Sequence, residues 1–432
     1  MPIIQVANGA SIDMQHNPAL SGNITTATQG QIVVTGANVV TDYRGSFYFT
    51  SNSFSGDGIV NSFGVSLNGR PWFAGSGFSF SLATYWNYLS VDRNSSRAFP
   101  YLFRGNDTFV GAEQNDIFEY DGGNDSFDGR EGVNTLYIPN NTAFGVTRFS
   151  DGSYGLATQN GSARLFNIQY INTPSQTAIP IISYTYADPT SYLAANPDLV
   201  RAGISSVDGA AQHYITNGYR ESRGTVFDAN AYMASNPDII RAGISDAQTA
   251  MQHYIANGVR EGRSTSFDSS SYMAANSDLV RAGITTAASA IQHYIANGIR
   301  EGRSTSFDAN SYIAANPDLV RAGVTTSAAA IQHYIANGIR EGRSTSFDSS
   351  SYASANPDLA RAGITSTSAL MLHYINNGVR ENRRTSPVRA SGQAGDISAL
   401  ATESIMQGSP QMTMAPVTQP SRSSASGMLA SA

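Results

Sequence analysis

Apolar and polar positions alternate through much of the first hundred residues. The stretches QIVVTGANVV, GSFYFTSNSF, GIVNSFGVSLNG and GFSFSLATYW are rich in β-branched and aromatic residues and are separated by Gly, Asn and Ser. Both features are typical of strands joined by turns, and Asn68-Gly69 is a turn signal. We therefore expect residues 1–101 to form a β-rich N-terminal domain, as a small antiparallel sheet or sandwich. A short amphipathic helix is predicted near residues 82–103.

The same strand pattern returns later in the chain. In GVTRFSDGSYGLATQNGSARLFNIQYI, the dipeptides Asp151-Gly152 and Asn160-Gly161 stand between alternating runs. Such dipeptides adopt the positive φ angles that two-residue hairpin turns require. Residues 138–186 are therefore expected to form a β-hairpin cap and a connector.

From residue 187 to residue 384 the apolar pattern becomes helical and recurs every forty residues. In the second copy Ala247, Ala250, Met251 and Tyr254 form one apolar stripe of a helix. The five copies share a tyrosine and a histidine in strict register: Tyr192, Tyr232, Tyr272, Tyr312 and Tyr352, and His213, His253, His293, His333 and His373. Self-similarity at this period indicates a repeat array. Because one unit cannot bury its own stripe, we expect five stacked α-helical repeats.

Helix boundaries within each unit can also be predicted. In the second copy, Asn236 is expected to cap a short helix that begins at Pro237. Ser245 with Gln248 predicts a capping box for the next helix, and the Asn-Gly pair at 257–258 predicts its end. Each unit is therefore expected to contain about three short helices.

A nine-residue period occupies residues 102–137, between the two strand-rich segments. It consists of the four units LFRGNDTFV, GAEQNDIFE, YDGGNDSFD and GREGVNTLY. The sixth position holds a carboxylate or an amide, the fourth is mostly glycine and the eighth is apolar: Asp107, Asp116, Asp125 and Asn134; Gly105, Gly123 and Gly132; Phe109, Phe118, Phe127 and Leu136. This pattern predicts a short parallel β-roll, in which glycine-rich turns alternate with strands that point one large side chain inward.

The sixth-position side chains are the candidate metal ligands. Stacked turns bring carboxylates and backbone carbonyls together, including those of the fourth-position glycines, and Ca²⁺ takes about six to eight oxygen ligands. Residues 107–131 include eight acids and only one Arg. Without a cation, the eight carboxylates would repel one another. Turns two apart lie on the same side, so position 107 pairs with 125 and position 116 with 134. We expect one good calcium site and a weaker one; a solenoid that stacks without metal is the alternative.

These units resemble the RTX, or haemolysin-type, calcium-binding repeat, GGxGxDx followed by an apolar residue. The forty-residue units, with Tyr-x-x-x-Asn-Pro-Asp, His-Tyr and Glu-Gly-Arg in order, are similar to a short helical module of large proteins of the same kind. Together the two resemblances cover residues 100–384. The double glycine of the motif is absent from every unit, and Gln114 and Asn134 replace motif residues.

The resemblance implies calcium binding, folding after export, and secretion of a bacterial protein by a type I apparatus. That apparatus reads an uncleaved C-terminal signal, which we expect within residues 385–432. The Ser, Ala, Gly, Pro and Met content of this tail also predicts disorder. The N-terminal sequence MPIIQVANGASIDMQHNP has neither the basic nor the apolar region of a cleavable signal peptide, which agrees with such a route.

Composition narrows the remaining function classes. The 432-residue chain has no Cys, which excludes disulfides and thiolate metal sites, and its 26 basic residues are all Arg. The net charge is −6 and no basic patch indicates a nucleic-acid partner. No run approaches the roughly 18 apolar residues that span a bilayer. The expected fold class is multidomain β + α: a β-rich N-terminal domain with a short parallel β-roll, followed by an all-α five-repeat array.

The repeats carry two further ladders of functional groups. The histidines stand one per unit, so we expect no single metal ion to gather them; each would bond to a neighbouring helix cap or lie exposed. Turns such as Arg260-Glu261-Gly262-Arg263 are expected to pair internally and with an Asp of the next unit. The alternative is that their guanidinium groups bind carboxylates or phosphates of a polysaccharide. The tyrosines are expected in the core.

No HExxH, GxSxG or Walker-type motif occurs, so we expect no enzyme. The predicted function is that of a secreted, calcium-binding structural protein of the cell surface, surface layer (S-layer) or biofilm matrix. Its array would act as a spacer or interaction module that binds surface polysaccharide or self-associates. One alternative is a glycan-binding adhesin that uses the Arg-rich turns. Another is an enzyme with an unrecognised site in residues 1–101.

Overall fold

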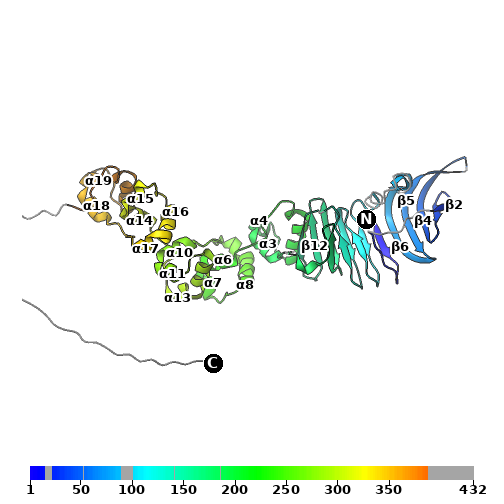
Figure 1. Ribbon diagram of the computed structural model, residues 1–432, viewed down its shortest axis with the longest axis horizontal. Helices are drawn as coiled ribbons and strands as arrows, with labels where there is room; N and C mark the ends of the chain where they lie inside the picture. Colours follow the sequence, from blue (N-terminus) through cyan, green and yellow to red (C-terminus); the bar gives the residue numbers. More distant parts are fainter. Residues whose placement is uncertain (15–21, 52, 89–100, 141, 185, 388–432) are drawn as a thin grey trace, which may run out of the picture. The chain divides into compact units, whose positions relative to one another are not determined.

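The computed structural model describes the chain except for residues 15–21, 52, 89–100, 141, 185 and 388–432 (Figure 1). A large mixed β-region is followed by an array of repeated helices, which confirms the predicted fold class. Contacts divide the chain into two compact units, Met1–Phe347 and Asp348–Ala432. Most of the predicted C-terminal tail lies outside the described residues.

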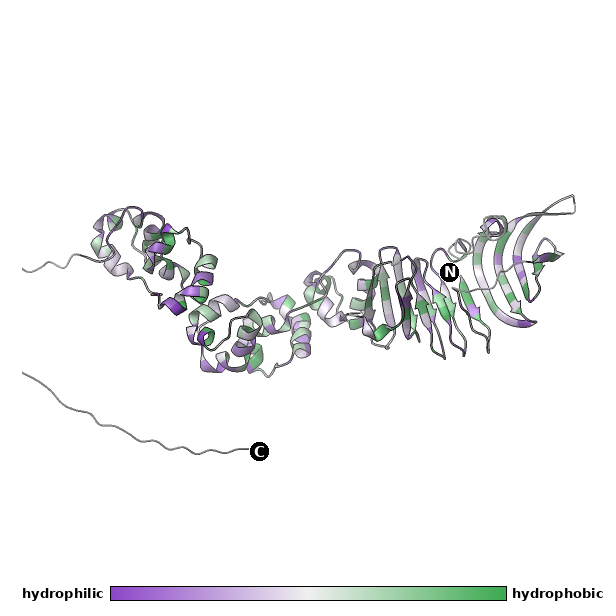
Figure 2. Ribbon diagram, in the orientation of Figure 1, coloured by the Kyte–Doolittle hydropathy of each residue, from purple (hydrophilic) through white to green (hydrophobic). Residues whose placement is uncertain are grey.

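Five strands form an antiparallel meander in the N-terminal part. They are β2 (Asn23–Ala27), β3 (Gln31–Thr35), β4 (Val39–Thr50), β5 (Ser53–Leu67) and β6 (Arg70–Ser81). The register places Tyr43 opposite Phe63 and Val65 opposite Phe73, and all four side chains are buried. Figure 2 shows the resulting alternation of apolar and polar positions along the strands. Period-two patterning therefore predicts this sheet correctly.

Two local predictions in this region are confirmed. Asn68 and Gly69 both have positive φ angles, 53° and 76°, in the turn between β5 and β6, as a hairpin turn of this sequence requires. Helix α1 (Leu82–Trp86) begins where a helix was predicted and buries Leu82 and Tyr85. The remainder of the helix predicted over 82–103 lies largely in the undescribed residues 89–100.

A single strand joins the meander to the roll. β1 (Ile3–Val6) pairs antiparallel with β6 and parallel with β7 (Thr108–Val110). The meander is therefore continuous with one sheet of the roll, in the twelve-stranded order β16-β11-β12-β13-β9-β7-β1-β6-β5-β4-β3-β2. A separate sandwich does not form because β1 supplies the edge on which both halves pair.

The nonapeptides form a parallel β-roll with two sheets. β7 and β9 (Gly123–Asp128) pair in one sheet, and β8 (Ile117–Glu119) and β10 (Thr135–Tyr137) pair in the other. The eighth-position residues are fully buried between the sheets. The rings of Phe109 and Phe127 stack with centroids 4.7 Å apart, so the apolar position of each unit faces inward as predicted.

The roll is longer than the nonapeptide pattern at both ends. β13 (Gly161–Phe166) pairs parallel with β9, and β14 (Tyr170–Thr173) pairs parallel with β10. At the other end, Asp13 bridges Ile117, and the amide of Ile117 donates to the Ile12 carbonyl. Residues 3–14 therefore supply a first coil, although they carry no nonapeptide signature.

The segment after the nonapeptides folds into the predicted hairpins. β11 (Phe144–Arg148), β12 (Tyr154–Thr158) and β13 pair antiparallel, and Asp151-Gly152 lies in the first turn as predicted. The second turn is Gln159-Asn160, one residue earlier than predicted, because Gly161 already pairs with Thr158 as the first residue of β13. The remaining strands and the 3₁₀ helix are β15 (Gln176–Pro180), β16 (Tyr186–Ala187) and η2 (Ile181–Ser183).

Each forty-residue copy contains three helices, and the third continues through a π-helical turn. In the second, third and fourth copies a further short helix follows that turn. The helices are α3 (Pro189–Ala195), α4 (Pro197–Arg201), α5 (Val207–His213); α6 (Ala229–Ser235), α7 (Pro237–Arg241), α8 (Ala247–His253), α9 (Val259–Glu261); α10 (Ser269–Ala275), α11 (Ser277–Arg281), α12 (Ala287–His293), α13 (Ile299–Glu301); α14 (Ala309–Ala315), α15 (Pro317–Arg321), α16 (Ser327–His333), α17 (Ile339–Glu341); α18 (Ser349–Ala355), α19 (Pro357–Arg361) and α20 (Thr367–His373). The π turns are η3 (Tyr214–Gly218), η4 (Tyr254–Gly258), η5 (Tyr294–Gly298), η6 (Tyr334–Gly338) and η7 (Tyr374–Gly378).

Copies within the first unit stack through small residues. Ala231 and Ala234 of the second copy lie in the same apolar cluster as Tyr272 and Met273 of the third. The first copy shares its cluster with Phe149 and Ala157 of the hairpin segment. The five tyrosines that define the repeat are completely buried, which confirms their assignment to the core.

Two predicted helix boundaries are wrong. Gly258 has a right-handed helical φ of −58°, and the chain leaves the helix only at Gly262, with φ 65°. Glycine is needed at 258 for space, because a Cβ there would lie 2.7 Å from the Tyr232 hydroxyl. The cap of α8 is Asp246, whose carboxylate accepts from the Thr249 amide, and not Ser245.

Candidate metal centre

The sixth-position side chains pair across successive coils on two sides of the roll. On the first side, the Asp107 amide donates to Asp125 Oδ1 at 2.9 Å. On the second side, the Asp116 amide donates to Asn134 Oδ1, also at 2.9 Å. All four side chains are buried. The two same-side pairs expected from the nine-residue spacing are therefore both present.

The first side leaves several carboxylate oxygens without a partner. Both oxygens of Asp107, Oδ2 of Asp125 and Oδ1 of Asp121 are shielded from solvent and accept no hydrogen bond within the described residues. Asp121 was not among the predicted ligands, because it stands at the second position of its nonapeptide. Its only sequence signal is the general excess of acids in this stretch. Burying unpaired carboxylates is strongly unfavourable unless a cation or a proton neutralises them.

Burial raises the pKa values of these carboxyl groups well above their ordinary range. The pKa of Asp107 rises to about 6, chiefly through burial, which the N-terminal amino group opposes. The pKa of Asp125 rises to about 7, through burial and the charge of Asp107. The pKa of Asp121 rises to about 8, through burial and the charges of Asp125 and Asp107. Without a cation, these three carboxyl groups therefore retain their protons to a higher pH than a solvent-exposed aspartate does.

The fourth-position glycines allow the turns to stack closely. Gly105, Gly123 and Gly132 have φ angles of 121°, 89° and 79°, in the region that favours glycine. A Cβ on Gly123 would lie 1.6 Å from the Gly105 carbonyl oxygen, and one on Gly132 would lie 2.5 Å from the Gln114 oxygen. The Gly123 carbonyl itself accepts from the Tyr120 hydroxyl at 3.1 Å. Close turn stacking therefore accounts for Gly123 and Gly132, whether or not their carbonyls bind metal. At Gly105 only the positive φ favours glycine, because a Cβ there would meet nothing within 4 Å.

The donor set of the first side fits a hard cation. Aspartate oxygens and nearby backbone carbonyls are the ligands that Ca²⁺ takes, in flexible arrangements of about six to eight. Among the residues that the structure describes, no three Asp, Glu or His side chains converge as a ready metal-binding group. A bound ion would therefore need backbone carbonyls in addition to Asp107, Asp121 and Asp125.

The second side is satisfied by hydrogen bonds. The two carboxylate oxygens of Asp116 accept from the amides of Ile12, at 2.7 Å, and Ala112, at 3.0 Å. The side-chain nitrogen of Asn134 donates to the carbonyls of Gly129 and Glu131. The weaker second site expected from 116 and 134 thus has its polar atoms paired within the chain.

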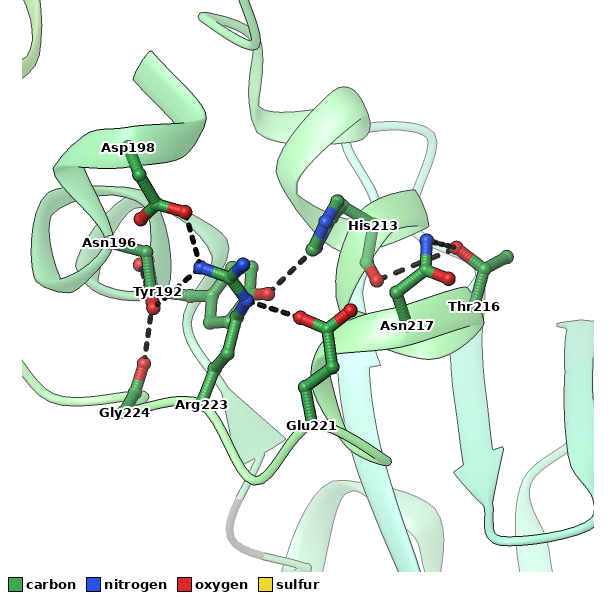
Figure 3. Close-up of polar contacts among 9 residues, drawn as sticks. All are labelled: Tyr192, Asn196, Asp198, His213, Thr216, Asn217, Glu221, Arg223 and Gly224. Carbon is green, nitrogen blue, oxygen red and sulfur yellow. Dashed lines mark hydrogen bonds and ion pairs between the residues drawn. The ribbon is translucent and has the colours of Figure 1, made fainter. Parts of the chain in front are cut away.

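The five histidines that recur every forty residues each form a hydrogen bond with a tyrosine of the same copy, and not with a helix cap as expected. In the first copy the Tyr192 hydroxyl lies 2.8 Å from His213 Nδ1 (Figure 3). The same bond recurs at 2.8–2.9 Å in the other four copies. Burial lowers the pKa of His213, with a smaller contribution from Arg223. The histidines are therefore packing residues, each of which satisfies one buried tyrosine hydroxyl.

One arginine of each turn forms ion pairs. In the first copy Arg223 lies between Asp198, at 2.7 Å, and Glu221, at 2.5 Å (Figure 3). Its equivalents Arg263, Arg303, Arg343 and Arg383 make the same two pairs. The Asp partner belongs to the same copy and not to the next one, so the predicted pairing was half right. The other arginine, such as Arg260, is exposed and approaches the Asn257 side chain at 3.3 Å.

Comparisons with known proteins add no relative. No family model matches the chain, and neither a curated protein nor a solved structure is significantly similar to it. Within the described residues, no helix is both long enough and apolar enough to cross a bilayer.

Proposed function

We propose that this chain is a secreted, calcium-binding structural protein of a cell surface or extracellular matrix, with the helical array as its spacer or interaction module. The observation that supports the proposal is the cluster of unpartnered, buried carboxylate oxygens of Asp107, Asp121 and Asp125. These carboxylates do not converge closely enough to hold a metal by themselves. A divalent cation that also takes backbone carbonyls as ligands would neutralise them.

Calcium fits better than other common metals. The cluster offers only oxygen ligands, whereas zinc and copper sites are built from His and Cys, and the chain has no Cys. Magnesium requires near-ideal octahedral geometry and retains its water, which suits a buried, irregular oxygen cluster less well. The ion would supply positive charge that joins the turn before β7, which holds Asp107, to strand β9, which holds Asp125.

This placement would make folding of the roll depend on calcium. Asp107 and Asp125 belong to adjacent coils of one side, so a shared ion would offset their mutual repulsion. Without the ion, the same charges destabilise the stack. Such a protein would remain loosely folded where calcium is scarce and become stable outside the cell, which agrees with export by a type I apparatus that reads residues 385–432.

The test is a calcium titration of the full chain, followed by circular dichroism during thermal melting. We expect millimolar CaCl₂ to raise the melting temperature of the β-region relative to chelator, and Asp107→Asn to abolish the rise. Glu113→Gln is the matched control, because Glu113 is an exposed acid of the same stretch. Equal melting with and without calcium would exclude the proposal.

Deletion of residues 385–432 should block export, and unimpaired secretion would exclude the proposed export route.

A second candidate is supported by the unpaired arginines. One exposed arginine recurs at each turn without an ion pair among the described residues: Arg220, Arg260, Arg300, Arg340 and Arg380. Their guanidinium groups are available to an anionic polysaccharide. Salt-sensitive retention on such a glycan, lost in the triple variant Arg260→Ala, Arg300→Ala and Arg340→Ala, would support an adhesin. Retention by the triple variant would exclude it, with Arg303→Ala as the control that removes an ion-paired arginine.

A further inference from the structure

The two sides of the roll differ by one atom at equivalent positions. Asp125 on the first side and Asn134 on the second both stand at the sixth position, and each accepts the amide of the preceding coil through Oδ1. Asp125 has a second carboxylate oxygen without a partner. Asn134 has an NH₂ group in its place, and that group is fully engaged.

The Asn134 NH₂ group lies in a nest of three carbonyl oxygens. Nδ2 is 2.9 Å from Gly129 O, 2.8 Å from Glu131 O and 3.0 Å from Asn167 O. An amide has two hydrogens, so three acceptors share them. Carbonyl oxygens that converge on one point repel one another unless a positive centre lies between them. The same arrangement of turn carbonyls is what a hard cation takes as ligands.

The orientation of the amide follows from this network. With oxygen and nitrogen exchanged, the side-chain oxygen would face three carbonyl oxygens, and the NH₂ group would face the Asp116 amide. The space is also filled, because a Cβ on Gly129 would lie 2.3 Å from Asn134 Nδ2. The NH₂ group and a cation would therefore compete for one position.

We propose that the side-chain amide of Asn134 takes the place of a cation on the second side of the roll, so that this side stacks without metal and the chain binds one ion rather than two. The number of one bound ion per chain rests on the proposed calcium site of the first side, whereas the role of Asn134 does not. Asp116 needs no ion either, because two backbone amides already bind its carboxylate.

The test replaces the NH₂ group by a carboxylate oxygen. Asn134→Asp places a negative oxygen among the three carbonyls, so in chelator the melting temperature of the β-region should fall by about 5 °C or more. Millimolar CaCl₂ should restore it, and calorimetric titration of the full chain should show two bound ions against one for the unaltered chain. Asn134→Ala should be destabilised without restoration by calcium, because it provides no charge.

Asn115→Asp is the matched control for added charge. Asn115 is exposed at the neighbouring fifth position and accepts the Val133 amide through Oδ1 at 2.8 Å, so its carboxylate variant should melt and titrate like the unaltered chain. Two ions bound by the unaltered chain would overturn the proposal. So would an Asn134→Asp variant that is stable in chelator, or one that calcium does not restore. If the unaltered chain binds none and Asn134→Asp binds one, the role of Asn134 stands and the proposed function fails.

Discussion

Replacing Asp125 by Asn separates two effects of this carboxylate: the destabilisation that its buried charge causes without metal, and its role in binding calcium. Asp125 Oδ1 accepts the Asp107 amide, and an asparagine keeps that acceptor. Its NH₂ group replaces the unpartnered Oδ2 beside the two remaining carboxylates. Asn134 shows that the fold accommodates an amide at the equivalent position of the other side. We therefore expect Asp125→Asn to stabilise the roll in chelator and to abolish its response to calcium.

The magnitude follows from the pKa of Asp125. Folding raises this pKa from 3.8 to about 7, and one pKa unit corresponds to about 1.4 kcal/mol, so ionising the buried group destabilises the fold by about 4 kcal/mol. Partial solvent screening lowers the figure, and we expect about 2–4 kcal/mol. Because the folded chain holds the proton up to about pH 7, the penalty grows from about pH 4 to pH 7 and is complete above pH 7.

The assay is thermal melting of the β-region in chelator and in millimolar CaCl₂, at pH 5 and at pH 8. At pH 8 in chelator the variant should melt about 5–15 °C above the unaltered chain, and at pH 5 the difference should become much smaller. Glu113→Gln should change neither value. A variant that is less stable than the unaltered chain at pH 8 in chelator, or that still responds to calcium, would refute the reasoning.

Three further predictions concern the repeats. Ser222 has a φ of 52° where the central copies have glycine, so Ser222→Gly should raise the free energy of unfolding by about 0.5–1 kcal/mol, measured by urea denaturation; no gain would show that the angle is unstrained. Gly298→Ala places a Cβ 2.5 Å from the Tyr272 hydroxyl and should lower stability by about 1–3 kcal/mol, whereas an unchanged midpoint would contradict the space argument. Tyr312→Phe removes the bond to His333 and should speed amide hydrogen exchange in α16 by an amount equivalent to about 1 kcal/mol; unchanged exchange would mean that the bond adds no stability.

Local patterns predict the elements well because their physical causes are local. Period-two alternation marks β4 to β6, and the forty-residue period marks the array. In the roll, the apolar eighth position predicts the buried column of Phe109 and Phe127. The nine-residue period also predicts which sixth-position residues share a side, because alternate strands of a roll belong to opposite sheets.

Contacts between distant segments could not be predicted in the same way. Residues 3–14 form the first coil of the roll without a repeat signature, because their pairing with Ile117 depends on backbone atoms that any sequence provides. The sequence predicts Gly258 at a helix end because glycine favours that position, but the nearby Tyr232 hydroxyl and Tyr254 ring are what require a residue without a Cβ there. The partner of each histidine was missed because tyrosine and histidine lie 21 residues apart.

The sequence by itself determined the succession of strands, roll and helical repeats, because periodicity of apolar positions is a local property that each element needs. Only the tertiary structure decided the chemistry of the candidate site. It left oxygens of Asp107, Asp121 and Asp125 buried without hydrogen-bond partners among the described residues, and it surrounded the Asn134 amide with three carbonyls. Whether a buried polar atom is satisfied depends on which atoms surround it in space, and residue spacing carries no such information.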